Sequence, residues 1–175
     1  MASDILIRQL ARLPLFQGLT LTQLDEIARR GEHAVYHPGA IIIDESAEAH
    51  GAVLIVAGEA ARVSGPELKA KVEPIPSGSL LGEAAMLVET AYGSTIVARG
   101  HVRALHIRRE ELHAQMAEDR TVAERIIDNI ARRLQSFFEE LRGLDEVFAR
   151  TAAAPPVSPP TAHGSTPAGL TAPVH

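Results

Sequence analysis

The sequence predicts an α+β fold, an antiparallel β-roll or jelly roll flanked by N-terminal helices and a long C-terminal helix. Three observations predict it: helical periodicity up to residue 32, short β-type runs over residues 33–108, and helical periodicity again over residues 109–150. The 175 residues are 46% hydrophobic and 22% charged, which is the composition of one globular domain.

Two short helices are expected within residues 1–32. Three leucines at helical spacing predict the first helix, which Pro14 ends because proline cannot continue a helix. The second helix is expected to begin after Thr20. The Thr20 hydroxyl can cap that helix while Gln23 reaches back to the Thr20 backbone, and Gly31 is expected to end it.

Residues 33–108 contain seven short runs of β-forming residues: HAVYH, AIIID, AVLIVAG, ARVS, LKAKVE, STIVA and VRALHI. Glycines and prolines separate the runs at the spacing of a small antiparallel barrel or jelly roll. One segment, Gly82–Leu87 (GEAAML), interrupts this pattern because it favours a helix between strands. The β-roll is therefore expected at 33–108, with a short internal helix.

Two helices are expected over residues 109–150, the second running from about residue 120. Apolar residues in the long helix are spaced alternately four and three apart, at Ile130, Leu134, Phe137, Leu141, Leu144 and Phe148. A stripe this narrow and long is hard to bury inside one small domain. The pattern predicts a homodimer formed through a parallel helical seam over residues 120–148.

Residues 151–175 hold six of the eleven prolines and no Lys, Arg, Asp or Glu. Such a segment cannot build a core, so a disordered Pro/Ala-rich tail is expected there. Two interpretations of the tail stay open: an inert extension, or a docking segment.

Composition also excludes several classes of protein. The absence of cysteine excludes disulfides and thiolate sites, and no apolar run approaches the roughly 20 residues of a membrane span. With 17 Lys and Arg against 22 Asp and Glu, and only 3% aromatic residues, the chain lacks the usual features of nucleic-acid binding. We expect a cytoplasmic protein that contacts neither membrane nor DNA.

The sequence contains no recognisable set of catalytic residues. His33 and His37 would share one face of a strand but stand too far apart for one metal ion, while His101 and His106 would point to opposite faces. No HxH or HExxH pattern is present. A non-enzymatic protein with no obligatory cofactor is expected.

The segment Leu80–Ala98 is the most informative part of the β-roll. Gly82 permits close backbone approach, and the first amides of the short helix after it would suit a phosphate. Glu83 could accept hydrogen bonds from sugar hydroxyls. The alternative interpretation is that Gly82 only turns the chain and Glu83 only stabilises the helix.

Gly82–Leu87 followed by Ser94–Ala98 resembles the phosphate-binding cassette of the cyclic-nucleotide-binding domain family, which includes the catabolite activator protein and kinase regulatory subunits. The wider layout is similar over roughly Leu10 to Leu141, in the segments LPLF with LT, PG and LIVAGE. The resemblance implies a β-roll with the cassette at residues 80–98 and a possible cyclic nucleotide ligand, cAMP or cGMP.

The resemblance also implies roles for single residues. Glu83 would hold the ribose 2′-hydroxyl, and the amides near Gly82 and Ala84 would face the ligand. Tyr92 stands where the family has an arginine that neutralises the cyclic phosphate, and a phenol supplies only one neutral donor. The complete set of expected ligand-binding residues is Gly82, Glu83, Ala84, Tyr92, Gly93, Ser94 and Thr95.

Another cation could replace the missing arginine. Arg62, Arg99 and Arg103 are strand residues that could reach the pocket, although strand arginines more often face water.

Two functions are therefore open. The first is a stand-alone regulatory domain that senses a cyclic nucleotide or related second messenger and signals through the dimer helix or an unidentified protein partner. The alternative is a ligand-independent interaction or adaptor module whose nucleotide pocket is degenerate. Family transcription factors carry a helix-turn-helix after the long helix, whereas this sequence has the uncharged tail there, so no direct DNA binding is expected.

Overall fold

The computed structural model describes residues 2–64 and 71–152 of the chain. The chain divides into two compact units, Met1–Gln135 and Ser136–His175. The first unit contains every strand described below. The tail expected at 151–175 lies outside the described residues from residue 153 onward.

The N-terminal region forms helix α1 (Ala2–Arg12), the 3₁₀ helix η1 (Pro14–Phe16) and helix α2 (Leu21–Arg30). The capping box predicted at Thr20 is present. The Gln23 amide donates to Thr20 Oγ1 at 3.3 Å, and the Thr20 amide donates to Gln23 Oε1 at 2.9 Å. Gly31 is the C-cap, as its spacing predicted.

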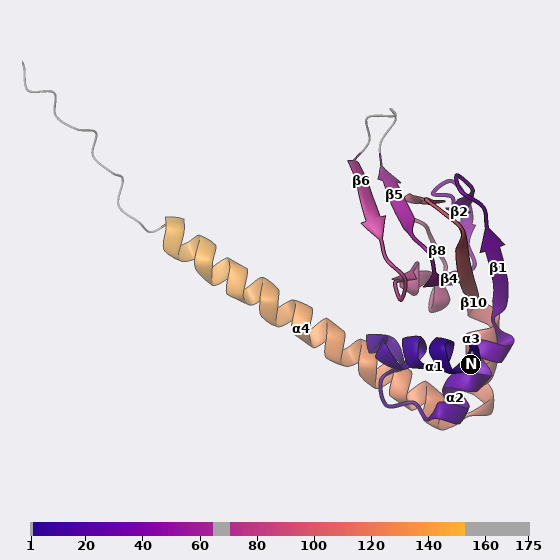
Figure 1. Cartoon of the computed structure of the whole chain (residues 1–175). Coiled ribbons are helices and arrows are strands. Elements are labelled where there is room, and N and C mark those ends of the chain that lie inside the picture. Colours follow the sequence, from indigo (N-terminus) through magenta and orange to yellow (C-terminus); the bar gives the residue numbers. More distant parts are fainter. Residues whose placement is uncertain (1, 65–70, 153–175) are drawn as a thin grey trace, which may run out of the picture. The chain divides into compact units, whose positions relative to one another are not determined.

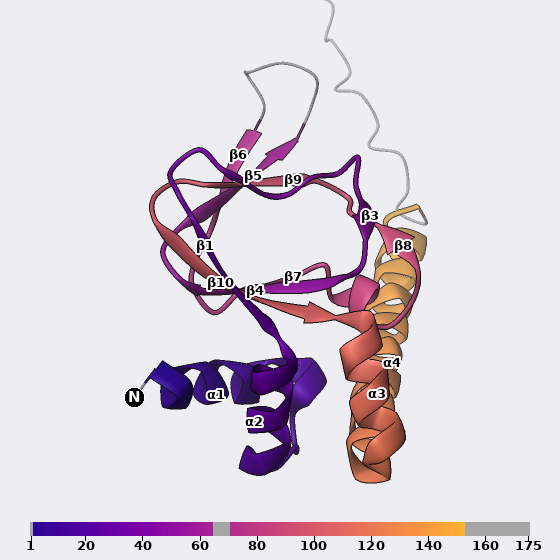
Figure 2. The ribbon, with the colours of Figure 1, turned by 90° about the vertical axis from the view of Figure 1, so that its right-hand side faces the viewer.

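The strands form two four-stranded sheets and one small pair, and every pairing is antiparallel. Sheet A has the order β1 (Glu32–Tyr36), β10 (Val102–Arg108), β4 (Gly51–Ala57), β7 (Leu80–Leu81). Sheet B has the order β2 (Ile41–Ile43), β9 (Thr95–Ala98), β5 (Ala60–Ser64), β6 (Lys71–Ile75). The small pair joins β3 (Glu48–Ala49) to β8 (Thr90–Ala91). Figure 2 shows the strands curving around a closed outline, with β9 and β5 opposite β4 and β7. The predicted jelly-roll class is confirmed.

Strand β4 explains how the core is divided. Leu54 and Val56 belong to a cluster shared with the helices, whereas Val53 and Ile55 belong to the cluster inside the roll. Successive strand residues point to opposite faces, so both faces of β4 are covered and its sequence is continuously apolar. In Figure 1, α1, α2 and α3 lie together at one end of the roll.

Helices α3 (Arg109–Glu118) and α4 (Arg120–Ala152) follow the roll. Near its start α4 is anchored by Val122 and Ile126, which are buried in the core shared with the other helices. Asn129 is 3% exposed, and its Nδ2 donates to the carbonyls of Leu15 at 2.7 Å and Gln17 at 2.9 Å. This amide therefore ties α4 to the N-terminal 3₁₀ helix.

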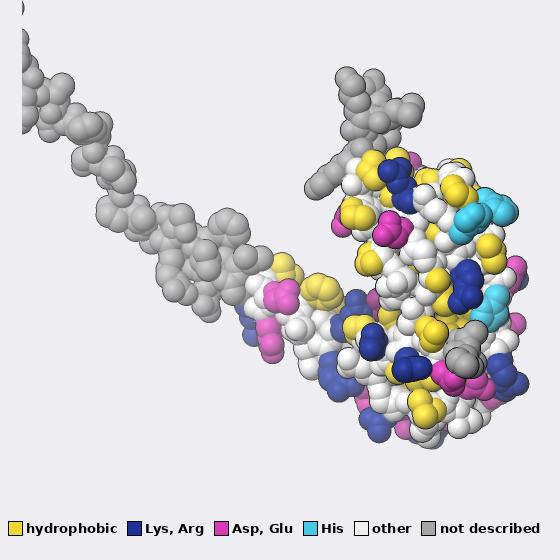
Figure 3. All heavy atoms as spheres, viewed as in Figure 1, with side chains coloured by type: hydrophobic (Ala, Val, Ile, Leu, Met, Phe, Trp, Pro, Cys, Tyr) yellow, Lys and Arg dark blue, Asp and Glu magenta, His cyan; other side chains and the backbone are white. Residues whose placement is uncertain are grey.

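Further along α4, the apolar stripe predicted from the heptad spacing is exposed. Leu134, Phe137 and Leu141 are 52%, 55% and 57% exposed, and apolar side chains are visible on this helix in Figure 3. The next two members, Leu144 and Phe148, lie on the helix, but their side chains fall outside the description.

On the face seen in Figure 3, Lys and Arg side chains are mixed with Asp and Glu over the helical part of the molecule. That face has no broad basic surface of the kind that phosphate backbones require. None of the helices in residues 2–64 and 71–152 has the length and apolarity needed to cross a membrane.

Replacing Asn129 should test the link between α4 and η1. Asn129→Ala leaves the carbonyl of the buried Leu15 and that of the exposed Gln17 without their donor, so the free energy of unfolding in urea should fall by about 1–3 kcal/mol. Asp128→Ala, on an exposed neighbouring position, should change it by less than about 0.5 kcal/mol. Equal losses in the two variants would contradict the anchoring role.

Candidate functional site

A cavity of about 470 Å³ opens between the cassette and sheet B, within the range of small-molecule sites. Six of the seven residues expected to bind a ligand line it: Gly82, Glu83, Ala84, Tyr92, Gly93 and Ser94. Thr95 does not line it, and the Thr95 hydroxyl instead accepts a hydrogen bond from the Glu45 amide at 3.4 Å. The structure therefore brings most of the predicted set around one space.

Gly82 turns the chain from β7 into the cassette. Its φ of +69° lies in the left-handed region, and a Cβ at this position would come 2.6 Å from Cε1 of Tyr92. Both the backbone and the neighbouring ring therefore require glycine.

The segment after Gly82 forms a short helix, as the sequence predicts. It is a single turn of 3₁₀ helix, η2 (Glu83–Met86), in which the Ala85 amide donates to the Gly82 carbonyl at 2.9 Å. Ala85 and Met86 are buried, so the turn is held by packing. With so few aligned peptides, the helix dipole expected at this point contributes little.

Tyr92 forms one wall of the cavity. Its hydroxyl donates to the Gly51 carbonyl at 2.8 Å, and burial raises the pKa of the phenol. The phenol therefore stays protonated, and its one proton is used in the hydrogen bond to the Gly51 carbonyl. The Tyr92 ring also lines a neighbouring cavity of about 440 Å³.

His106 on β10 lines that neighbouring cavity. Its Nε2 lies 2.7 Å from the Tyr36 hydroxyl, and desolvation lowers the His106 pKa. Desolvation therefore favours the neutral form of the ring, which shares a hydrogen bond with the Tyr36 hydroxyl.

Glu83 lines the main cavity but is already paired. Its carboxylate accepts a hydrogen bond from Arg133 of α4, and both side chains are partly buried. This contact joins residues 50 positions apart, so no local pattern in the sequence could reveal it. A ligand hydroxyl reaching Glu83 would share or displace this guanidinium.

Arg62 is the cation that the structure brings to the cavity. It lines the wall from β5, and its Nη1 donates to Glu73 Oε2 at 3.0 Å. Its Nε is buried and has no hydrogen-bond partner among residues 2–64 and 71–152. Arg103 of β10 and Arg99, which follows β9, are exposed, whereas Arg62 is partly buried and lines the cavity.

The register of sheet B explains why Arg62 faces inward. Arg62 lies directly opposite Ile96 of β9, and side chains directly opposite in a sheet share one face. Ile96 is buried and also lines the cavity.

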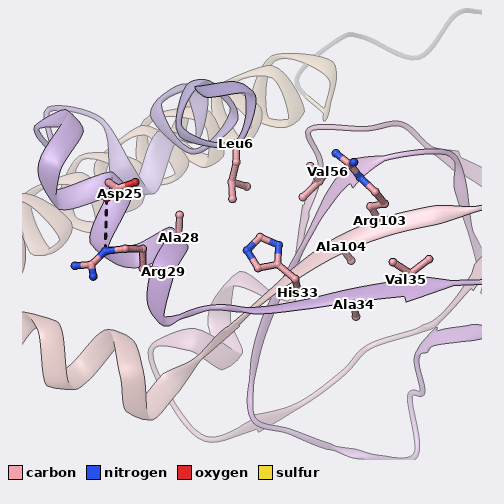
Figure 4. Close-up of a pocket in the computed structure, with 10 residues that line it drawn as sticks. All are labelled: Leu6, Asp25, Ala28, Arg29, His33, Ala34, Val35, Val56, Arg103 and Ala104. Atoms are coloured by element: carbon pink, nitrogen blue, oxygen red, sulfur yellow. Dashed lines mark ion pairs between the residues drawn. The ribbon is translucent and has the colours of Figure 1, made fainter. Parts of the chain in front are cut away.

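A separate cavity of about 360 Å³ lies near α1, α2, β1 and β10, and Figure 4 shows its lining residues. Leu6, Ala28 and Val56 are among the apolar side chains there, and Asp25 pairs with Arg29 at 3.6 Å. None of the seven expected ligand-binding residues lines this cavity.

The histidines form one contact that strand spacing did not predict. The rings of His37 and His101 meet edge to face, with centroids 5.4 Å apart. In the part of the chain that the structure describes, no three His, Asp or Glu side chains gather in a way that could hold a metal ion.

Comparison with known proteins agrees with this geometry. Residues 33–119 match the family model described as cyclic nucleotide-binding domain. The N-terminal domain of a transcriptional regulator from Streptomyces coelicolor A3(2) superposes with a TM-score of 0.69 at 18% identity, over 76% of this chain and 94% of that one. At this identity the likeness concerns the fold.

Two further solved structures are similar. A cyclic nucleotide-binding-like protein from Brucella abortus has a TM-score of 0.59 at 26% identity, covering 64% of this chain and 97% of that one. The Thermus thermophilus catabolite activator protein has a TM-score of 0.58 at 24% identity, covering 76% and 63%. A search among curated proteins gives no significant match.

Substituting glycines should separate backbone strain from contact with Tyr92. Gly78→Ala meets only the cost of a left-handed backbone, about 1–2 kcal/mol, because its φ is +88° and no atom lies within 4 Å of the added Cβ. Gly82→Ala should lower the free energy of unfolding by more, since its Cβ also meets the Tyr92 ring. In a Tyr92→Leu background that excess should shrink, and an unchanged excess would contradict the ring contact.

Proposed function

Because residues 33–119 belong to the cyclic nucleotide-binding domain family, we propose that this chain is a regulatory protein that binds a cyclic nucleotide in the cassette cavity and signals through α4. The proposed protein is non-enzymatic and cytoplasmic, with cAMP or cGMP as the candidate ligand. The observation that carries the proposal is the ion pair between Glu83 and Arg133.

The ion pair supports a coupling between the cavity and α4. The carboxylate that lines the cavity is the same one that holds Arg133 on the helix. A ribose hydroxyl that donates to Glu83 competes for its oxygens, so occupancy weakens the hold on α4. Since coupling between two equilibria is reciprocal, any partner that moves Arg133 changes nucleotide affinity by the same factor.

We propose that the signal is transmitted through a dimer that α4 forms with a second copy of the chain. The exposed stripe at Leu134, Phe137 and Leu141 continues from the turn of α4 that carries Arg133, at the spacing of a two-helix seam. A dimer would bury this stripe. Signalling would then pass through the dimer or a protein that binds it, without direct contact to DNA.

Calorimetric titration with cAMP and cGMP tests ligand binding. Glu83→Gln should weaken binding about tenfold, because an amide oxygen accepts a ribose hydroxyl less strongly than a carboxylate does. Arg133→Gln should tighten binding, because it frees Glu83. Arg120→Gln, which removes an exposed pair with Glu124, serves as the control and should leave affinity unchanged. A wild-type protein that binds neither nucleotide at millimolar concentration would instead favour the ligand-independent adaptor.

Light scattering tests the dimer. The wild-type protein should have twice the mass of the 175-residue chain, and Leu134→Asp with Leu141→Asp should give a monomer, because aspartates in the seam would lose their hydration unpaired. Leu21→Asp, at a highly exposed position of α2, should stay dimeric. A monomeric wild type at micromolar concentrations would overturn the seam.

A further inference from the structure

We propose that Arg62 is the anion-binding residue of the cavity, and that the group it binds is the phosphate of a phosphate ester. The inference deepens the proposed function and rests on it, since it names the residue that meets the charged part of the ligand. It places the anion beside β5, away from position 92.

The Tyr92 side chain has no free donor for a phosphate. The Tyr92 hydroxyl already donates to the Gly51 carbonyl, and the ring is held against Gly82. Reaching into the cavity would break the hydrogen bond and lose the ring packing. A charged partner for the anion therefore has to come from another residue than Tyr92.

Arg62 is suited to that role by position and charge. Among the described residues that line the cavity, it is the one cationic side chain, and Glu83 is the one acidic side chain. Glu83 is engaged by Arg133 of α4, whereas Arg62 comes from β5. Ser94, which lines the same cavity, lies two residues before Ile96, the cross-strand partner of Arg62, and can add a hydroxyl donor.

The hydrogen bonds of Arg62 are incomplete in a way that a phosphate can complete. One nitrogen, Nη1, pairs with Glu73, while Nε is buried with no acceptor in the part of the chain that the structure describes. A guanidinium offers Nε and an Nη side by side, which matches two oxygens of a phosphate. A ligand that draws the side chain towards the cavity would satisfy Nε.

Glu73 acts in this proposal as a competitor of the ligand. Its carboxylate lies directly across from Arg62 in the β5–β6 register, and the Arg62 and Glu73 side chains are 40% and 58% exposed. A pair so exposed is weak and exchanges easily. An incoming phosphate can therefore take over the guanidinium while the glutamate turns to water.

The test uses the full chain and calorimetry with cAMP, cGMP, adenosine and inorganic phosphate. Arg62→Gln should weaken cyclic nucleotide binding about tenfold to a hundredfold, the effect of losing a charge-assisted hydrogen bond. Arg62→Lys should recover part of the loss, because an ammonium restores the charge but cannot donate two parallel hydrogen bonds to a phosphate. Glu73→Gln should tighten binding severalfold, and Arg99→Gln, an exposed arginine outside the cavity, should leave it unchanged.

The ligands separate the possible sources of the effect. Adenosine lacks the phosphate, so its affinity should not depend on Arg62. If inorganic phosphate displaces the nucleotide from the wild type but not from Arg62→Gln, the phosphate group is what Arg62 binds. Adenosine affinity that falls with Arg62→Gln as much as cAMP affinity does would overturn the assignment.

The two proposals fail differently. A wild type that binds no cyclic nucleotide overturns the proposed function and this inference together. Binding that is equally tight in Arg62→Gln overturns the role of Arg62 alone. Should Arg62→Gln lose its cooperative thermal unfolding, Glu73→Gln decides the question: tighter binding supports the inference, and unchanged binding overturns it.

Discussion

The left-handed backbone at Gly82 is the constraint on which the arrangement of the cavity depends. With φ at +69°, the chain leaves β7 and enters one turn of 3₁₀ helix that buries Ala85 and Met86. Glu83 is thereby left at the cavity wall, within reach of Arg133. The absence of a side chain at Gly82 also gives the Tyr92 ring its place and brings its hydroxyl to Gly51. One residue thus fixes both the carboxylate and the phenol.

Two polar side chains on adjacent turns of α4 connect this helix to other parts of the molecule. Asn129 is buried and holds the carbonyls of Leu15 and Gln17, whereas Arg133 is partly exposed and holds Glu83. Residues four apart lie on one face of a helix, so both contacts use the same face. The buried amide makes a stable anchor, and the more exposed ion pair is the easier one to exchange. A bound ligand is therefore expected to break the Arg133–Glu83 contact more easily than the hydrogen bonds of Asn129.

Local patterns predicted much of the fold, because the signals were complete within a few residues. The capping box at the start of α2 needs only Thr20 and Gln23, three residues apart. The strands β3, β7 and β8 have two residues each, too few for any alternation to be seen. The inward direction of Arg62 depends on its register with Ile96, a pairing between distant segments. The apolar Ile96 in β9 marks the inner face of that strand. Had the pairing of β5 with β9 been known, this residue would have indicated that Arg62 lies on the same face.

The residues that line the cavity help to distinguish a ligand-binding pocket from a degenerate one. A space of about 470 Å³ could be reduced at little cost by larger apolar side chains, which would add burial and dispersion contacts. Instead it is lined by Arg62, whose Nε has no acceptor among the described residues, and by Glu83, whose charge is balanced through α4. The incomplete hydrogen bonding of Arg62 costs stability in the empty protein, and a bound phosphate would recover that cost while a ligand hydroxyl would use the Glu83 carboxylate. A physical reason to keep both groups exists if the cavity is filled, and for this reason we favour the sensor over the adaptor.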